Sequence, residues 1–181
     1  MKKIDNTEID NSLNDFPDNL VKFIKGSLDT KNFSKKLSAR TSLVKMGKTI
    51  ISQMHKLLDS ENDSLRMEAA KIIELIADRR SIPLLINLID DPKFDIRWIA
   101  AEGLIKISRR SILPLLKSVR EGESSLFLNR GAHHVLLSLV NEEEKNKLIQ
   151  LLLSLDNYHE LGETASVQAS VVLKTLFKYN K

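Results

Sequence analysis

Two histidines, His133 and His134, stand side by side within the apolar run "NRGAHHVLLSL" of residues 129–139. Imidazoles can bind metal ions or transfer protons. On a helix, however, adjacent residues point about 100° apart, whereas two ligands of one metal usually stand four residues apart. The sequence has no cysteine, and no Asp or Glu lies three or four residues from either histidine. We therefore expect no metal and no catalytic pair here, but packed, hydrogen-bonded rings or, alternatively, a polar groove.

Motifs of catalytic sites are absent from the rest of the sequence. It contains no glycine-rich phosphate loop, no HExxH and no GxSxG. The acidic residues are scattered, and no pair is placed for acid–base chemistry. We therefore expect a protein that is not an enzyme and that needs no cofactor.

The composition is that of a globular protein with a basic excess. The 181 residues are 42% hydrophobic and 29% charged, with a net charge of +4. Residues 31–60 carry seven Lys or Arg against one acid, whereas residues 121–150 carry three against five. Without cysteine or a long apolar run, we expect a cytoplasmic protein that does not enter a membrane. The basic excess leaves a nucleic-acid partner open.

An internal repeat organises the chain. Residues 65–91 align with residues 96–122 at an offset of 31 without a gap. The alignment places Arg66 on Arg97, Ala69–Ala70 on Ala100–Ala101, Arg79 on Arg110 and Pro83 on Pro114. Weaker copies precede this pair at an offset of 30 and follow it at an offset of 33. Each copy has helical periodicity on both halves, and strand signals are absent, so the sequence predicts stacked helical hairpins.

The repeat gives the expected domain organisation. We expect disorder in residues 1–12 and one repeat domain over residues 13–181. The expected elements of the domain are a capping helix (17–29), hairpins at about 33–60, 63–91, 94–122 and 124–155, and a final helix at 162–179. Trp98 lies on an apolar face of its predicted helix, and we expect its side chain to pack in the core. The alternative is an exposed side chain that stacks on a ligand.

These repeats resemble HEAT-like repeats, in particular the short kind found in phycobilisome lyases. Arg66, Ala69, Ala70, Pro83 and Leu84 carry the resemblance, with their counterparts in the next copy. It implies an all-α class and an α-solenoid of about four to five helical hairpins in a right-handed superhelix. It also implies that Arg66, Arg97 and Arg130 form a polar ladder between units. Deoxyhypusine hydroxylase has a similar architecture but needs several His–Glu pairs, and only His159–Glu160 is present.

Two surfaces are candidates for binding partners. For the first of them, the simpler interpretation is that solvated turns carry charges that serve solubility. The turns between paired helices place Arg79, Arg80, Arg109 and Arg110 along one edge, which becomes acidic at Glu142–Glu144. The second helices line the inner, concave face of such a stack. Aligned positions on them are occupied by Lys56, Ile86, Asn87, Lys117 and Gln150. The mixture of apolar, amide and cationic groups favours a protein partner over a phosphate backbone.

Three functions follow in order of preference. The first is a non-catalytic scaffold or adaptor that binds another protein through its concave face. The second is nucleic-acid binding, as in the DNA glycosylases built from HEAT-like repeats, whose stack is also basic. The third is a bilin lyase or chromophore chaperone, which rests on the resemblance alone. We also expect a homodimer through the C-terminal end, "VVLKTLFKYNK", where the last unit lacks its second helix.

Overall fold

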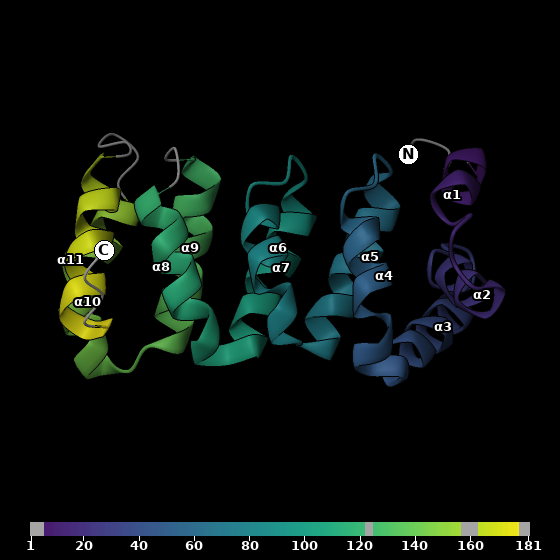
Figure 1. Cartoon of the computed structure of the whole chain (residues 1–181), viewed down its shortest axis with the longest axis horizontal. Coiled ribbons are helices and arrows are strands. Elements are labelled where there is room, and N and C mark those ends of the chain that lie inside the picture. Colours follow the sequence, from purple (N-terminus) through teal and green to yellow (C-terminus); the bar gives the residue numbers. More distant parts are fainter. Residues whose placement is uncertain (1–5, 122–124, 157–162, 178–181) are drawn as a thin grey trace. The chain divides into compact units, whose positions relative to one another are not determined.

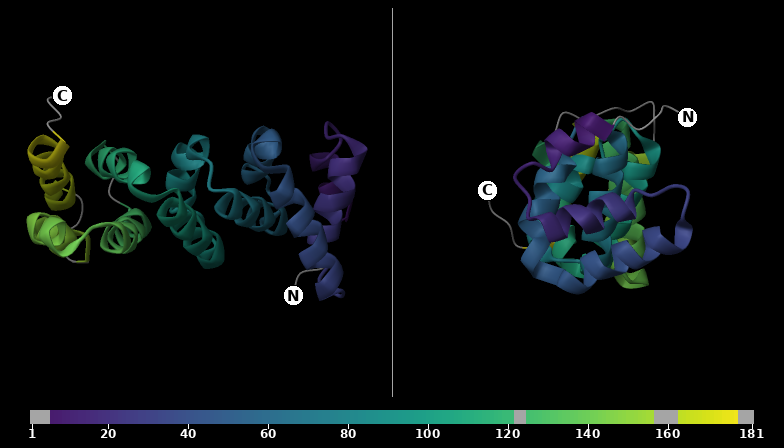
Figure 2. Two further views of the ribbon diagram at one scale, coloured as in Figure 1. Left: turned by 90° about the horizontal axis from the view of Figure 1, so that it is seen from below. Right: turned by 90° about the vertical axis from the view of Figure 1, so that its right-hand side faces the viewer.

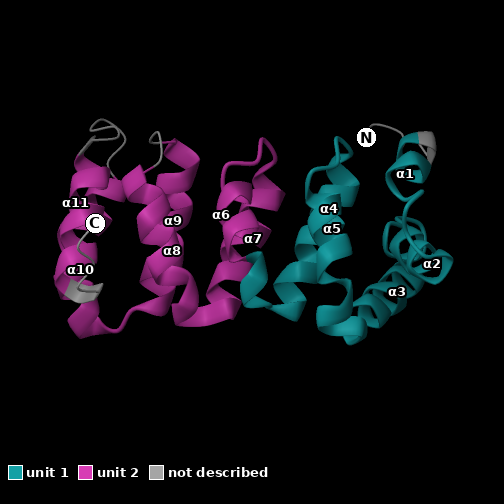
Figure 3. Cartoon of the chain, viewed as in Figure 1, with its two compact units in different colours: residues 1–81 teal, residues 82–181 magenta. Residues whose placement is uncertain are grey.

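The computed structural model describes residues 6–121, 125–156 and 163–177. Every regular element in these ranges is an α-helix or a short 3₁₀ helix, so the predicted all-α class is confirmed (Figure 1). The helices follow one another as packed antiparallel pairs, as in a HEAT-type α-solenoid. The chain divides into two compact units, residues 1–81 and 82–181 (Figure 3). The hand of the superhelix stays a prediction.

The first unit is built from helices that pack in sequence order. Its elements are α1 (Asn6–Ser12), α2 (Asp18–Ser27), α3 (Phe33–Met46), η1 (Gly47–Ile50), α4 (Ile51–Leu58), α5 (Asp63–Ile76) and η2 (Arg79–Ser81). In this unit α2 lies against α3, and α4 lies against α5 (Figures 1 and 2). The α2–α3 crossing is close, because a Cβ on Gly26 would stand 3.0 Å from the Cβ of Ala39.

The N-terminal segment differs from the expectation of disorder. Residues 1–5 lie outside the described residues, but Asn6–Ser12 form α1. Ile9 on α1 and Leu13 just after it are buried. Asn62 Nδ2 also donates a hydrogen bond to Glu8 Oε2 at 3.4 Å. The polar composition that indicated disorder occupies exposed positions such as Asp10 and Asn11, while the two apolar residues hold the helix on the unit.

A buried ion pair crosses the core of the first unit. Arg40 on α3 donates from Nε and Nη2 to the two carboxylate oxygens of Glu68 on α5, at 2.7 and 2.6 Å. Glu68 is only 3% exposed. Such a bidentate pair compensates the cost of burying the carboxylate, and it raises the pKa of the Arg40 guanidinium.

The second unit contains the remaining helices. They are α6 (Ile82–Leu88), α7 (Phe94–Ile107), η3 (Ser108–Ser111), α8 (Ile112–Glu121), α9 (Leu126–Leu139), α10 (Glu142–Asp156) and α11 (Glu163–Phe177). Within this unit α7 packs on α6 and α9, and α11 packs on α8 and α10. Leu104, Leu115, Val135 and Leu136 are fully buried in the core between them. The first helices α7 and α9 thus stand side by side, as do the second helices α6 and α8.

The turns after the first helices each contain a residue with a positive φ. Gly47, Ala77 and Ser108 follow α3, α5 and α7, and all three have a positive φ, of 57°, 53° and 73°. Glycine adopts such angles without strain, but alanine and serine do not. The sharp turn lets the chain leave the first helix and enter the 3₁₀ segment that begins the second.

The structure corrects the alignment at these turns. Both η2 and η3 end on an Arg-Arg-Ser sequence, at Ser81 and Ser111, and an isoleucine then begins the second helix. Arg79 therefore corresponds to Arg109, not to Arg110, and the local offset is 30. One additional residue in α8 restores the offset of 31 at Pro114. Both serines are fully buried, and the Ser111 hydroxyl donates to the Leu104 carbonyl at 2.9 Å.

Candidate protein-binding surfaces

Three of the residues expected on the inner face meet in one groove. Ile86 and Asn87 on α6 and Lys117 on α8 line an open groove of about 430 Å³ in the second unit. The other lining residues are Pro83, Pro114, Ser118 and Glu121. Ile86 forms the buried floor, while Asn87 and Pro83 are exposed. The groove thus presents an apolar strip with an amide, a hydroxyl and charges of both signs.

The other two expected residues of this face lie elsewhere. Lys56 is exposed on α4 of the first unit. Gln150 is exposed on α10 of the second unit and does not line the groove. Sequence alignment therefore identified residues of two neighbouring second helices, α6 and α8, that line one groove.

One of the turn arginines is engaged within the first unit. Arg80 donates from Nε and Nη2 to the two carboxylate oxygens of Asp78, at 3.0 and 3.1 Å. Its Nη2 also reaches the Lys48 carbonyl at 3.2 Å. The side-chain hydrogen bonds from Arg80, together with that from its backbone N–H, lower the pKa of the Asp78 carboxyl to about 2. Arg80 is thus a structural residue of its turn.

A second turn arginine pairs with the acidic turn that follows α9. Arg109 donates from Nη1 to Glu144 Oε2 at 2.9 Å, and its Nη2 contacts the other carboxylate oxygen. Arg109 Nη1 also donates to the Leu139 carbonyl at 3.2 Å. The guanidinium lowers the pKa of Glu144 to about 2. The basic and acidic turns therefore neutralise each other in part. Of the four turn arginines, Arg79 and Arg110 are exposed and form no ion pair with another described residue.

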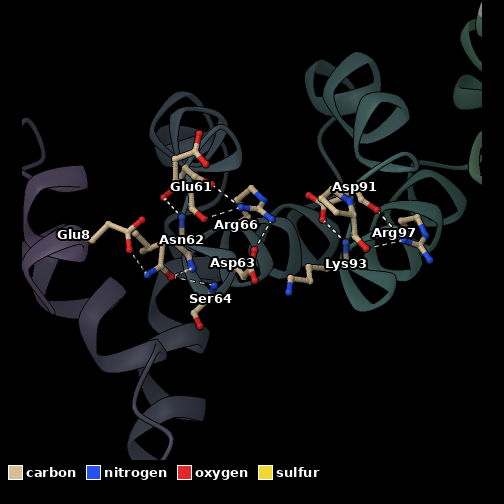
Figure 4. A network of polar contacts seen from close by, with 12 residues as sticks. Glu8, Glu61, Asn62, Asp63, Ser64, Arg66, Asp91, Lys93 and Arg97 are labelled. Atoms are coloured by element: carbon tan, nitrogen blue, oxygen red, sulfur yellow. Dashed lines mark hydrogen bonds and ion pairs between the residues drawn. The ribbon is translucent and has the colours of Figure 1, made fainter. Parts of the chain in front are cut away.

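The aligned arginines Arg66 and Arg97 have the same local role. Arg66 Nη1 donates to the Ser60 and Glu61 carbonyls, at 2.8 and 3.1 Å. Arg97 Nη1 donates in the same way to the Asp91 and Pro92 carbonyls, again at 2.8 and 3.1 Å (Figure 4). Each arginine thus fixes the loop that enters its own first helix. These contacts lie within each arginine's own repeat, and the expected ladder between repeats stays a prediction.

Trp98 is not in the core, contrary to the expectation. It is 50% exposed, and Phe94, one helical turn before it on α7, is 65% exposed. The Trp98 ring stacks on Phe94 at a centroid distance of 6.5 Å and on His134 at 4.8 Å. Although α9 stands beside α7, the neighbouring helix leaves Trp98 and Phe94 exposed to solvent.

The exposed rings border a pocket between α7 and α9. Its volume is about 170 Å³. It is lined by Ile89, Phe94, Arg97, Trp98, Ala101, Phe127, Arg130, Gly131 and His134. The Arg97 guanidinium lies 3.9 Å from the ring centre of Phe127 and 5.6 Å from that of Phe94. The pocket therefore combines aromatic walls with a cation held over two rings.

The two histidines have different surroundings. His134 lines the pocket, and its Nε2 donates to Glu102 Oε1 on α7 at 3.0 Å. His133 is half-buried and is not one of the lining residues. The two side chains thus point in different directions, as expected for adjacent residues on a helix. In the ranges that the structure describes, no group of three His, Asp or Glu side chains could hold a metal ion.

Two signals in the repeat could have revealed this pocket. At the offset of 33, Phe94 aligns with Phe127, so each of the two helices has an aromatic residue in its first turn. The same offset aligns Trp98 with Gly131, the largest residue with the smallest. A Cβ at Gly131 would stand 2.4 Å from Ile89 Cγ2, so the glycine permits the close approach of α9. Neither signal shows by itself that the rings are exposed.

The C-terminal end of the second unit has exposed apolar residues. They are Ile149 and Leu153 on α10 and Val167 and Val171 on α11. Dimerisation through this end stays a prediction. His159–Glu160 and residues 178–181 lie outside the described residues.

No helix in the described part of the chain is long and apolar enough to cross a membrane.

Comparison with known proteins shows what the repeat is similar to. A search of curated proteins found no match to this chain. A family model of HEAT repeats matches residues 51–132. The match begins at α4, ends within α9, and includes both the groove on the second helices and most of the aromatic pocket. Residues 51–132 of this chain are therefore similar to HEAT repeats.

Proposed function

We propose that this chain is a non-catalytic adaptor that binds a segment of another protein in the groove of α6 and α8. The observation that supports the proposal is the groove itself, in which Ile86, Asn87 and Lys117 lie together. HEAT-repeat domains commonly act as protein-interaction scaffolds. The groove would correspond to the concave face of such a scaffold.

The chemistry of the groove is suited to a polypeptide. Pro83 and Pro114 stiffen the rim, because proline has a fixed φ, and a stiff surface loses little entropy on binding. Asn87 and Ser118 offer hydrogen bonds to a main chain. Lys117 and Glu121 provide both signs of charge, whereas a polynucleotide would be repelled by the carboxylate.

The test is a pull-down from cell lysate in which the groove is blocked. Asn87→Arg would place a long side chain in the groove, and Asn19→Arg on α2, also an exposed position, is the matched control. Half of each lysate is treated with nuclease, and the salt concentration is varied. We expect one protein to be retained by the wild type and by Asn19→Arg, with or without nuclease, and to be lost with Asn87→Arg.

Two outcomes would contradict the proposal. Retention that disappears with nuclease, or with modest added salt, would identify a nucleic-acid partner, because counterion release makes such binding steeply salt-dependent. Equal retention by both variants would exclude the groove as the docking surface.

A further inference from the structure

We propose that the pocket between α7 and α9 is a second protein-binding site, which takes one large apolar side chain from an acidic segment of a partner. It lies on the first helices, whereas the groove lies on α6 and α8. The two sites share no lining residue, so this inference does not depend on the proposed function.

The exposure of the aromatic walls is the first argument. Phe94, Trp98 and Phe127 are the described aromatic residues of the second unit that are exposed, and all three line this one pocket. Contiguous apolar surface in water is unfavourable and commonly marks an interaction site. Tryptophan and arginine are also the residue types that contribute most to binding energy at protein interfaces.

The pocket is organised before any ligand arrives. Trp98 is held between Phe94 and His134, and Glu102 fixes the imidazole of His134 at 3.0 Å. Arg97 is held by the two carbonyls of its loop. Side chains that are already fixed lose little conformational entropy on binding, which favours affinity from a small contact area.

The volume of the pocket limits what can occupy it. Pockets for cofactors and other small-molecule ligands measure about 300–1,000 Å³, whereas this one measures about 170 Å³. That space fits a single large apolar side chain. The floor of Ile89, Ala101 and Gly131 is apolar, so the buried part of the occupant must be apolar as well.

The charges of the pocket determine the character of the flanking residues. Arg97 forms no ion pair with another described residue, and Arg130 brings a second cation to the lining. None of the described lining residues is an Asp or Glu. Carboxylates beside the apolar side chain would therefore be attracted, while a cation such as a methylated lysine would be repelled.

A single-stranded nucleic acid is the less favoured occupant. It would also offer rings and negative charge, but such ligands are bound in long basic grooves with successive stacking residues. Here the rings lie in one pocket. The next helix, α10, does not continue a basic groove, because its first turn carries three acidic residues, Glu142, Glu143 and Glu144.

The test is a selection of peptides on the full chain. A phage library of random 12-residue peptides is selected in parallel on wild type, Trp98→Ala and Phe33→Ala. Phe33 is a matched control, because it is 76% exposed at the start of α3 and far from the pocket in sequence. We expect wild type and Phe33→Ala to enrich peptides with a large apolar residue flanked by Asp or Glu, and Trp98→Ala to recover about tenfold less of them.

A direct readout confirms where the peptides bind. Trp98 is the only tryptophan, so its fluorescence and its indole NMR signal report on the pocket alone. A selected peptide should shift both signals, and its Asp/Glu→Asn/Gln version should bind at least several-fold more weakly. The same signals are followed with a 15-nucleotide oligo(dT) and with increasing protein concentration.

Four results would overturn the inference. They are selected peptides without acidic enrichment, equal recovery on Trp98→Ala, a response to oligo(dT) but not to the peptides, and a Trp98 response to protein concentration alone. The last would indicate a second copy of the chain as the occupant. Circular dichroism of Trp98→Ala checks its fold, and its retention of a groove-dependent partner would show that only the pocket is affected.

Discussion

The indole of Trp98 stacks on the imidazole of His134, with ring centres 4.8 Å apart and planes inclined by 28°. The contact joins α7 to α9 at the surface, and Glu102 holds the imidazole in place. One residue of the histidine pair thus supports an exposed aromatic site, while the other, His133, is half-buried and does not line the pocket. The relationship has a spectroscopic consequence.

Replacing His134 should expose Trp98 further. In His134→Ala the indole loses one stacked ring, so its fluorescence emission should move to longer wavelength, and the free energy of unfolding should fall by about 1 kcal/mol. His133→Ala is the control, since His133 does not line the pocket, and its emission should match that of the wild type. An equal shift in both variants would mean that the stack does not persist in solution.

The buried pair of Arg40 and Glu68 should be costly to break on one side. Arg40→Met leaves the Glu68 carboxylate buried without its partner, and we expect the free energy of unfolding to fall by about 3 kcal/mol. The double variant Arg40→Met/Glu68→Leu should recover most of this loss, because no buried charge remains. Urea denaturation of the three proteins provides the measurement. A double variant no more stable than Arg40→Met would contradict this account.

Acid should weaken the fold through Asp78 and Glu144. The pKa of each carboxyl is lowered in the folded chain, to about 2, by hydrogen bonds from Arg80 and Arg109. The unfolded chain therefore binds more protons as the pH falls. The stabilisation is complete above about pH 5, and it is lost progressively as the pH falls from there toward 2.

The Glu144 contribution can be measured by substitution. Glu144→Gln should be less stable than wild type at pH 7, and the difference should shrink by pH 3, in urea titrations at both values. Glu142→Gln, at a more exposed carboxylate in the same turn of α10, is the control and should change little at either pH. A Glu144→Gln difference that is constant with pH would show that the ion pair does not shift this titration.

Ser108 should gain stability when replaced by glycine. Its φ of 73° and ψ of −155° fall in a region that is largely restricted to glycine, and the equivalent residue after α3 is Gly47. Ser108→Gly should therefore raise the free energy of unfolding by about 1 kcal/mol. The backbone carbonyl of residue 108, to which the Ser111 hydroxyl also donates at 2.7 Å, is retained in this variant. Ser108→Ala keeps the strain and should show no such gain; a similar gain from alanine would place the effect elsewhere.

Several features were predictable because they depend on local pattern. The repeat of Arg66 and Pro83 at Arg97 and Pro114 indicated paired helices, and the helices are found there. Amphipathic periodicity and the position of proline are properties of short segments, so they can be read without knowing what each helix contacts. The same reasoning separated the two histidines of α9, since adjacent helical residues diverge.

The surroundings of individual side chains were not predictable in this way. Periodicity placed Trp98 on an apolar face, but only the spacing of α7 and α9 decides whether that face is covered. Arg109 looked like a free cation at an edge, yet Glu144, 35 residues later in the chain, binds it. The sequence by itself determined which segments are helices and which faces are apolar, because both follow from local propensity and period. The tertiary structure alone decided which rings remain exposed and which charges are paired, because both depend on distances between residues remote in the chain.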